Sequence, residues 1–394
     1  MGIIFSSFNG LEPKLRFPNF IEKWTRFEAE NIFKNITDKN HPTDTVLTIQ
    51  QGRGTLPRDL SGRNILYDNT NTKNYKRVQF GDFIIHLRSF EGGLEMANEQ
   101  GIVSPAYTIL RYIKPIAFGF YKAYFRTNEF INHILSKSVE GIRDGKQISY
   151  DAFKWLAIPY CQLEEQQKIA DFLSLVDQRI EKQRQLVESL KKYKRGLFLK
   201  LYGSFEKKSY KISELGKYCA TGTLSKDDID VSGVYQCILY GELFTKYGET
   251  IRQVISRTNV TPTYLSSTNE ILFPSSTTAD ALSLIFPSSL KIENIFLGGD
   301  LFTIKLKNEF DSDFISYLIN FVYKNTFARY AQGITIIHLH YTDIKEQIID
   351  IPDIVVQLKI SDIMKKIEAI IENNDNELNS LLLMKKSFLQ QMFI

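Results

Sequence analysis

Two histidines form the best-spaced pair of potential metal ligands in the sequence. His338 and His340 are separated by one residue in a segment predicted to be a strand or its exit, so their side chains point the same way. A metal site would need further ligands, and no Cys or other His lies near them in sequence. Cys161, Cys219 and Cys237 are scattered and lack CxxC spacing. We therefore predict a surface or core role for the histidines, no metal site, and three reduced thiols.

Motifs for nucleotide binding and group transfer are also missing. Residues 141–147 resemble a phosphate-binding loop, but they are one residue short between the glycines and lack the final hydroxyl. Amino methylation of DNA would need a glycine-rich cofactor loop and a Pro-Pro-aromatic box, and the sequence contains no Pro-Pro dipeptide. It contains no GxGxxG, HExxH or GxSxG motif either. We predict that the chain has no catalytic residues.

The composition is that of an ordinary soluble globular protein. The chain has 394 residues, of which 43% are hydrophobic and 24% charged, and this length suffices for two domains with separate cores. It has no run of about 18 apolar residues, as a membrane-spanning helix would require. The first residues lack the basic segment and apolar core of a signal peptide. These features predict a cytoplasmic protein.

The net charge of +4 is too small to indicate nucleic-acid binding by itself. Its distribution is uneven. Residues 1–160 carry 21 Lys and Arg against 16 Asp and Glu, whereas residues 203–350 carry 14 against 17. The two halves of the chain therefore differ in the sign of their charge.

An internal repeat with an offset of 191 residues organises the sequence. Several identical residues match when the segment after Gln166 is placed on the segment after Gln357. The matched pairs are Gln166 and Gln357, Lys168 and Lys359, Asp171 and Asp362, Ile180 and Ile371, Leu190 and Leu381, and Lys194 and Lys385. Tyr150 also falls on Tyr341, so the register extends upstream of both segments.

Both repeated segments show the 3.5-residue period of a coiled coil, and most positions of each seam are apolar. The first seam consists of Ile169, Leu173, Val176, Ile180, Gln183, Val187, Leu190, Lys194, Leu197 and Leu201. The second consists of Ile360, Met364, Ile367, Ile371, Asn374, Leu378, Leu381, Lys385, Phe388 and Met392. A helix of about 40 residues would be ~60 Å long, which suits a spacer. We predict that the two helices pack on each other.

The polar exceptions in the seam carry more information than the apolar positions. Gln183 falls on Asn374 and Lys194 on Lys385, so both helices interrupt the seam at the same two layers. Polar seam residues reduce stability and commonly fix partner and register. The alternative is that two unrelated amphipathic helices share a period by chance, which the shared identities and polar layers disfavour.

The regions outside the helices contain short β-branched and aromatic runs separated by turn residues. Predicted strands lie at residues 45–49, 83–86, 106–110, 271–273 and 301–304. In two corresponding passages a strand ends in a polar loop, at residues 86–93 and 273–279, and a second strand follows. We predict a second repeated module, more diverged than the helices, so that one scaffold carries two different recognition surfaces.

Residues 158–202 resemble the central conserved region of the specificity subunits of type I restriction-modification systems. They read IPYCQLEEQQKIADFLSLVDQRIEKQRQLVESLKKYKRGLFLKLY, with a Pro-containing strand exit, an LxEQQKIAxFLS helix start and a Leu/Lys-rich tail. The passage Leu15-Arg16-Phe17-Pro18-Asn19-Phe20, followed by Trp24, is similar to the usual opening of these proteins. Residues 351–394 resemble the second conserved region in a diverged form, with Val355-Val356-Gln357-Leu358 at its start.

The resemblance implies an α+β fold with an internal pseudo-twofold repeat and four segments. These are target-recognition domains at residues 1–160 and 204–350, and long helices at 161–203 and 351–394 that pair antiparallel. It further implies that each domain reads one half of a split DNA sequence. The helices would set the spacing and dock two modification (methyltransferase) subunits, which motor-nuclease restriction subunits join. S-adenosylmethionine, ATP and Mg would belong to those partners, and this chain would bind no cofactor.

Residues that could contact DNA follow from chemistry and loop position. Base readout needs side-chain donors and acceptors, whereas phosphate contacts position the domain. The candidates are Arg53, Arg88, Ser89, Arg143 and Lys146 in the first domain, and Ser275, Ser276, Thr277, Thr278 and His340 in the second. The second domain's negative charge requires either a local basic patch, from Lys246, Arg252, Arg257 and Arg329, or phosphate contacts supplied by partner subunits. We expect the latter, and therefore salt-sensitive, weak DNA binding by the chain alone.

Two other classes of function remain open at the level of sequence. The chain could be a coiled-coil adaptor whose globular regions bind proteins and not DNA. It could also be an enzyme with an unrecognised site, such as a nuclease with scattered carboxylates, although the missing motifs disfavour this.

Overall fold

The computed structural model describes residues 13–61, 69–141 and 147–393. The chain folds as two compact units, which we describe separately. Unit 1 comprises Met1–Arg184 and Asn376–Ile394, and unit 2 comprises Gln185–Asp375. Each unit therefore contains one globular region together with part of each long helix. Within the described part of the chain, no helix is long and apolar enough to cross a membrane.

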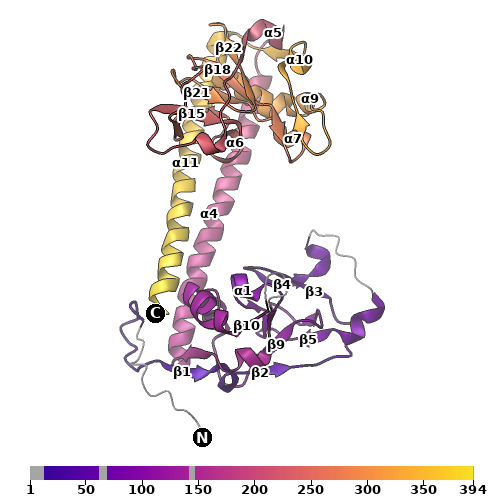
Figure 1. Ribbon diagram of the computed structural model, residues 1–394, viewed down its shortest axis with the longest axis vertical. Helices are drawn as coiled ribbons and strands as arrows, with labels where there is room; N and C mark the ends of the chain where they lie inside the picture. Colours follow the sequence, from indigo (N-terminus) through magenta and orange to yellow (C-terminus); the bar gives the residue numbers. More distant parts are fainter. Residues whose placement is uncertain (1–12, 62–68, 142–146, 394) are drawn as a thin grey trace. The chain divides into compact units, whose positions relative to one another are not determined.

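The two long predicted helices are present as α4 (Leu163–Gly203) and α11 (Ile354–Gln391) (Figure 1). Both follow a strand that contains or precedes a proline, since Pro159 lies in β12 and Pro352 directly follows β24. Helix-forming Leu, Lys, Glu and Gln then dominate, and α4 passes through Gly196 without a break. At ~1.5 Å per residue each helix is roughly 60 Å long.

Within each unit the helices run antiparallel. In unit 1 the Phe172 ring packs on Phe388 with centroids 4.9 Å apart, and Lys385 forms an ion pair with Asp177. In unit 2, Lys194 forms an ion pair with Glu368 at 3.2 Å. These two ion pairs are equivalent under the repeat, because a shift of 191 residues places Lys194 on Lys385 and Asp177 on Glu368.

Unit 1 is built around a four-stranded antiparallel sheet in the order β2-β9-β6-β7. Two further antiparallel pairs, β5 with β8 and β1 with β12, and the hairpin β3–β4 complete its main strands. The strand bounds are β1 Thr25–Glu28, β2 Phe33–Ile36, β3 Leu47–Gln50, β4 Gly54–Pro57, β5 Lys76–Val78, β6 Phe83–Ile85, β7 Glu95–Met96, β8 Gly101–Val103, β9 Thr108–Tyr112 and β12 Ala157–Tyr160. A short pair, β10 (Val139–Glu140) and β11 (Gln147–Ile148), lies near its end. Besides its parts of α4 and α11, unit 1 has the short α-helices α1 Ser89–Gly92, α2 Phe118–Tyr124 and α3 Tyr150–Phe153.

Unit 2 contains a five-stranded sheet in the order β14-β22-β18-β20-β16 and a three-stranded sheet in the order β17-β15-β21. Two antiparallel pairs, β13 with β24 and β19 with β23, accompany them. The strands are β13 Lys208–Lys211, β14 Gly216–Ala220, β15 Tyr235–Leu239, β16 Thr250–Ile251, β17 Arg257–Thr258, β18 Glu270–Pro274, β19 Ser276–Thr277, β20 Ser288–Leu290, β21 Phe296–Gly298, β22 Leu301–Leu306, β23 Ile337–His338 and β24 Ile348–Ile351. The helices include α5 Ile212–Leu215, α6 Tyr240–Thr245, α7 Ala281–Leu284, α8 Ser312–Leu318, α9 Lys324–Ala328 and α10 Tyr341–Ile344.

The strand order β2-β9-β6-β7 of unit 1 recurs in unit 2 as β14-β22-β18-β20. The pair β1–β12 likewise corresponds to β13–β24, and the 191-residue offset places β12 directly on β24. The chain is therefore an α+β protein with an internal repeat and two long antiparallel helices, which confirms the predicted fold class.

The repeated glutamines explain how each helix joins its globular region. The Gln166 side chain accepts the Ala117 amide, at the start of α2, and donates to the Cys161 carbonyl at 2.8 Å. Gln357 accepts the Asp311 amide, at the start of α8, and donates to the Pro352 carbonyl at 2.9 Å. Both glutamines are fully buried, so each satisfies backbone groups that water cannot reach.

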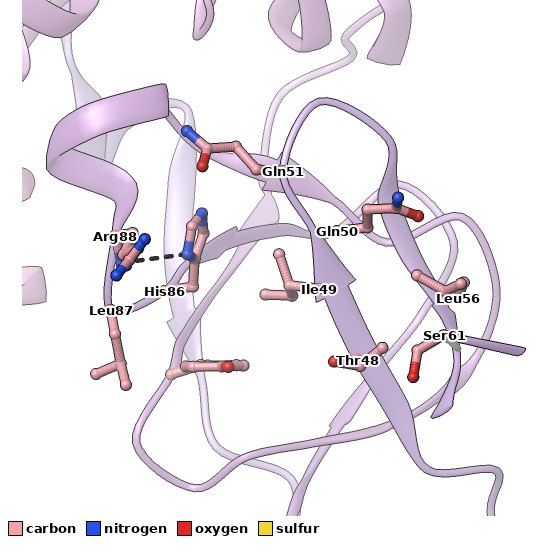
Figure 2. Close-up of a pocket in the computed structure, with 10 residues that line it drawn as sticks. Thr48, Ile49, Gln50, Gln51, Leu56, Ser61, His86, Leu87 and Arg88 are labelled. Carbon is pink, nitrogen blue, oxygen red and sulfur yellow. Dashed lines mark hydrogen bonds between the residues drawn. The ribbon is translucent and has the colours of Figure 1, made fainter. Parts of the chain in front are cut away.

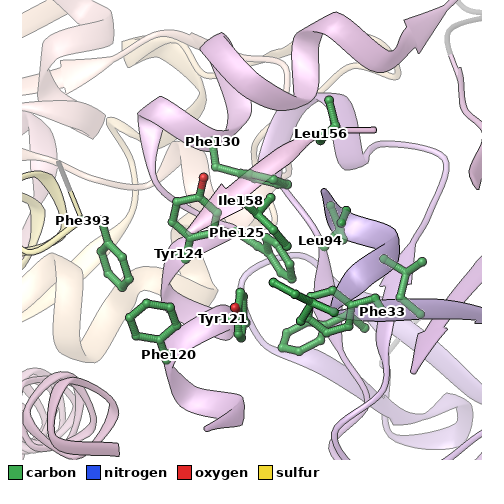
Figure 3. Close-up of a cluster of buried hydrophobic side chains, with 14 of the residues drawn as sticks. Phe33, Leu94, Phe120, Tyr121, Tyr124, Phe125, Phe130, Leu156, Ile158 and Phe393 are labelled. Carbon is green, nitrogen blue, oxygen red and sulfur yellow. The ribbon is translucent and has the colours of Figure 1, made fainter. Parts of the chain in front are cut away.

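Aromatic packing forms the core of unit 1 (Figure 3). The Phe33 ring packs against Tyr121 at 5.2 Å, and Phe125 packs against Phe130 at 4.7 Å. Phe393, which follows α11, joins this cluster through Phe120 and Tyr124. Ile169 and Leu173 of α4 belong to the same core. The start of α4 and the end of the chain after α11 therefore contribute to one core.

Candidate nucleic-acid interface

The strands that lead into the two predicted polar loops, β6 and β18, occupy equivalent places in the repeat, and similar turns precede them. Gly81 and Asn269 precede β6 and β18, and both adopt a positive φ, of 90° and 64°. The next residue in each case is a buried carboxylate that accepts a backbone amide three residues earlier: Asp82 from Gln79 at 2.8 Å, and Glu270 from Ser267 at 2.8 Å. The two strands are therefore fixed in the same way before the chain enters loops of different composition.

In unit 1 the loop after β6 forms one side of a cleft of about 530 Å³. Figure 2 shows this cleft, with the β3–β4 hairpin on the other side. Its lining offers amide, hydroxyl, imidazole and guanidinium groups beside aliphatic surface. The residues are Thr48, Ile49, Gln50, Gln51, Leu56, Ser61, His86, Leu87, Arg88 and Tyr107.

The loop that carries Arg88 is braced from within. Ser89 is completely buried, and its hydroxyl accepts the His86 amide at 2.8 Å. The Arg88 amide donates to His86 Nδ1 at 3.3 Å, while the Arg88 side chain is exposed. Burial lowers the pKa of His86, so its ring is neutral at neutral pH. We therefore assign Ser89 to holding the loop and keep Arg88 as a candidate contact.

Arg53 lies at the exposed tip of the β3–β4 hairpin, and a buried carboxylate holds that tip. Glu95 accepts the amides of Gly52 at 2.7 Å and Gly54 at 2.9 Å, and it forms an ion pair with Arg126. Gly54 has a φ of +88°, and a Cβ there would lie 2.5 Å from the Met96 carbonyl oxygen. The Arg53 backbone is thus fixed while its side chain remains exposed. The other two candidates, Arg143 and Lys146, lie outside the described residues.

In unit 2 the structure brings the predicted 275–278 loop beside the histidine segment. β19 pairs with β23 so that Ser276 lies opposite His338 and Thr277 opposite Ile337. Ser276 is buried, and its hydroxyl donates to Asp300 at 2.9 Å, which gives it a structural role. Ser275 and Thr277 are half-buried, whereas Thr278 and His340 are exposed.

The rings of His338 and His340 stack, with centroids 6.1 Å apart and planes inclined by 6°. Both side chains are exposed, which places the pair on the surface. Residues 13–61, 69–141 and 147–393 contain no cluster of three or more His, Cys, Asp or Glu that could hold a metal. The imidazoles remain available for hydrogen bonds to a macromolecular ligand.

Most of the candidate basic patch of unit 2 is engaged internally. Lys246 forms an ion pair with Glu242 at 2.6 Å, and Arg252 forms one with Asp313 at 3.1 Å. The Arg257 guanidinium donates to the Gly233 and Val234 carbonyls. Arg329 is exposed. Three of the four cations are thus held by acceptors of their own unit.

The predicted seam positions are all buried or half-buried in the structure. Among the interrupting residues, Gln183 and Lys194 are buried, and Asn374 and Lys385 are half-buried. Lys194 contacts two carboxylates of unit 2, Glu249 at 2.8 Å and Glu368 at 3.2 Å. The polar layer at Lys194 is therefore an ionic cluster and not a single cross-helix hydrogen bond.

Sequence reasoning missed several residues of these surfaces. Gln50, Gln51 and Tyr107 line the cleft of unit 1 only because the hairpin and two distant segments meet there. Glu95 supports the cleft from a short strand that gave no distinct signal. The apolar residues before His338 gave no local signal that Ile334 and Ile336 lie in an exposed turn.

A family model for the type I restriction modification DNA specificity domain matches residues 27–192 and again residues 206–383. Over 107 residues the chain is 34% identical to a putative type I restriction enzyme MjaX specificity subunit of Methanocaldococcus jannaschii. That alignment covers 27% of this chain and about a quarter (24%) of the length of that relative.

Solved structures show the same fold across nearly the whole chain. A type I restriction-modification S subunit from M. genitalium matches with a TM-score of 0.56 and 16% identity, covering 98% of this chain and 99% of its own. A second chain, from a structure concerned with complex assembly and conformational transition of the type I R-M system, matches with a TM-score of 0.55. Its identity is 13%, and the match covers 94% of this chain and 97% of the other.

Proposed function

Because the chain belongs to the type I restriction modification DNA specificity family, we propose that it reads a DNA sequence in two parts, one with each unit. The repeat of the sheet is the observation that carries this proposal. The order β2-β9-β6-β7 recurs as β14-β22-β18-β20, yet β6 and β18 lead into loops of unrelated composition. One scaffold used twice with different side chains is suited to reading two different half-sites.

In unit 1 the groups around the cleft match the donors and acceptors that base edges require. A glutamine amide such as Gln50 or Gln51 can form two hydrogen bonds with adenine in the major groove, and an arginine can form two with guanine. Arg53 and Arg88 are exposed on the hairpin and on the loop that border this cleft. We assign base readout to these four side chains.

Among the candidate DNA contacts of unit 2, the exposed side chains carry a hydroxyl or an imidazole. Most of the candidate basic residues of this unit are paired internally. Thr278 and His340 are suited to base edges, but Arg329 alone among the four basic candidates has no internal acceptor in the described structure. Phosphate contacts supply much of the affinity for DNA. We therefore propose that partner subunits provide many of them, and that the chain alone binds DNA weakly and with strong salt dependence.

The paired helices are proposed to act as the spacer between half-sites and as docking sites for two modification subunits. Each unit leaves apolar helix residues exposed that do not serve its core: Leu175, Leu382, Leu383 and Met384 in unit 1, and Leu186, Tyr193 and Ile370 in unit 2. Tyr193 and Met384 occupy the same repeat position, as two equivalent docking sites would require. In this proposal the chain itself is non-catalytic, and S-adenosylmethionine, ATP and Mg belong to the modification and restriction subunits.

The test is to co-express the chain with a type I modification subunit in a host that lacks adenine methylation, and to map N6-methyladenine across the genome. We expect a split motif, with two short half-sites around a fixed gap. Exchanging residues 1–160 for those of a relative should change one half only. If the proteins co-purify and no motif appears, the chain is a protein–protein adaptor and the DNA-reading proposal is wrong.

A further inference from the structure

We infer that an exposed turn in unit 2, together with the strand end that follows it, enters the major groove of DNA and contacts the 5-methyl groups of thymine. This surface, which we call the 334–340 face, consists of Ile334, Ile336, His338 and His340. The inference rests on the proposed function and deepens it, because it names a base feature that unit 2 reads. Thymine methyl groups are accessible only in the major groove, and that groove is wide enough to admit elements such as a two-stranded β-ribbon. The turn that carries Ile334 and Ile336 is closed by backbone hydrogen bonds between Gln332 and His338.

The surface begins as an exposed turn at residues 334–336 and continues into a strand end with one buried side. Ile334 is 100% exposed and Ile336 47%, and both histidines are exposed. Between them, Leu339 is completely buried in the core of unit 2 and Ile337 is half-buried. His338 ends β23, and its ring stacks on that of His340, whereas Ile334 and Ile336 belong to the exposed turn before the strand.

The segment is held by hydrogen bonds, so the exposed isoleucines are part of a defined turn. Gln332 and His338 exchange two backbone hydrogen bonds, at 2.9 Å and 2.7 Å, and the Leu339 amide donates to the Ser275 carbonyl at 3.0 Å. Gly333 has a φ of +137°, and a Cβ there would lie 1.9 Å from the Ile336 carbonyl oxygen. The turn therefore requires glycine at this position and presents Ile334 at its tip.

The segment that carries the 334–340 face lacks acidic residues, so it would not repel the phosphates of DNA, whereas residues 203–350 as a whole are acidic. Residues 203–350 carry more acidic than basic residues, yet no Asp or Glu occurs from Lys324 to Thr342. The acidic groups nearest in the hydrogen-bond network are already engaged: Asp300 accepts the Ser276 hydroxyl, and Asp343 accepts the His340 amide at 2.8 Å. A protein partner would also cover exposed isoleucines, but the absence of acidic residues and the flanking imidazoles favour DNA.

In this proposal the bases are recognised in two ways, by apolar contact with thymine methyl groups and by hydrogen bonds to base acceptors. The Ile334 and Ile336 side chains pack against thymine methyl groups, which distinguishes T·A pairs from C·G pairs. His338, at the end of β23, and His340, at the N-cap of α10, donate to acceptors of neighbouring bases. The half-site read by unit 2 should therefore contain at least one T·A pair whose identity depends on the isoleucines.

The experiment compares methylation motifs of the co-expressed complex with wild-type chain, the double variant Ile334→Ala/Ile336→Ala, and the control Val231→Ala. Val231 is a β-branched residue of unit 2 that is 93% exposed and lies outside the 334–340 face. We expect the double variant to accept other bases at one thymine position of one half-site, with the other half unchanged. The control should keep the wild-type motif. Co-purification with the modification subunit verifies that each variant is folded.

A second measurement tests the methyl contact directly. Deoxyuridine replaces thymidine at the sensitive position of a duplex that carries the recovered motif, and binding by the complex is measured. We expect about fourfold weaker binding by the wild type, as for the loss of one buried methyl group, and almost no change for the double variant. An unchanged motif with the double variant, or equal sensitivity to deoxyuridine in both proteins, would show that the inference is wrong. If the wild type itself yields no motif, the proposed function has failed.

Discussion

Lys194 and Lys385 occupy the same position of the repeat, yet their surroundings predict very different contributions to stability. The Lys194 side chain is 8% exposed and pairs with Glu249 and Glu368, which are 18% and 21% exposed. The Lys385 side chain is 29% exposed and pairs with Asp177, which is 56% exposed. The same substitution, Lys→Met, therefore tests a buried ion cluster in unit 2 against a surface pair in unit 1.

The magnitudes follow from burial. Removing one partner of a buried pair costs roughly 3–5 kcal/mol, because a charge stays buried without compensation. Lys194→Met removes the cation beside Glu249 and Glu368, but both carboxylates retain some solvent and Glu368 keeps Arg252 at 3.8 Å, so we expect about 3 kcal/mol, the lower end of that range. An exposed ion pair contributes about 0.2–1 kcal/mol, so Lys385→Met should cost less than about 1 kcal/mol.

Native-state hydrogen exchange is the suitable assay, because the two units need not unfold together. Protection of α11 amides near Ile360–Ile371 reports on unit 2, and protection near Leu378–Phe388 reports on unit 1. Adding Glu249→Gln and Glu368→Gln to Lys194→Met should restore most of the lost stability, because no unpaired charge then remains. Equal losses for the two lysine variants, or no recovery in the triple variant, would refute the reasoning.

Three further predictions concern single sites. Glu95→Gln should lower the stability of unit 1 by about 2 kcal/mol in thermal unfolding, since it weakens charge-assisted bonds to two hairpin amides; Glu91→Gln, at an exposed carboxylate, is the control. Gln357→Leu should cost about 2–4 kcal/mol in urea unfolding, because it leaves a buried amide and carbonyl unpaired, and a loss under 1 kcal/mol would contradict this. Burial raises the pKa of Asp313, but Lys291, the hydrogen bond from Ser289 and Arg252 together outweigh it and hold that pKa below its ordinary value of 3.8. The carboxylate therefore stabilises unit 2 above about pH 4, and this contribution is lost as pH falls through the lowered pKa. An acid titration followed by circular dichroism should show a shallower loss for Asp313→Asn, and identical titrations would count against the linkage.

The sequence by itself was sufficient to predict the long helices and to identify the offset of 191 residues and the family. These features repeat along the chain: a 3.5-residue period identifies a helix wherever it falls, and Gln166 and Gln357 match without any knowledge of their contacts. The predicted strands at residues 83–86 and 301–304 also correspond to β6 and β22, because short β-branched runs are local signals.

Only the tertiary structure decided which side chains face solvent and which support them. Ser89 and Ser276 have the chemistry of DNA contacts, but both are buried: the Ser89 hydroxyl accepts the His86 amide of its own loop, and the Ser276 hydroxyl donates to the distant Asp300. Lys194 and Lys385 cannot be distinguished by sequence position, and they differ because Glu249 reaches only one of them. Periodicity is a property of neighbours along the chain, whereas burial and pairing depend on residues far apart in sequence, which no local pattern specifies.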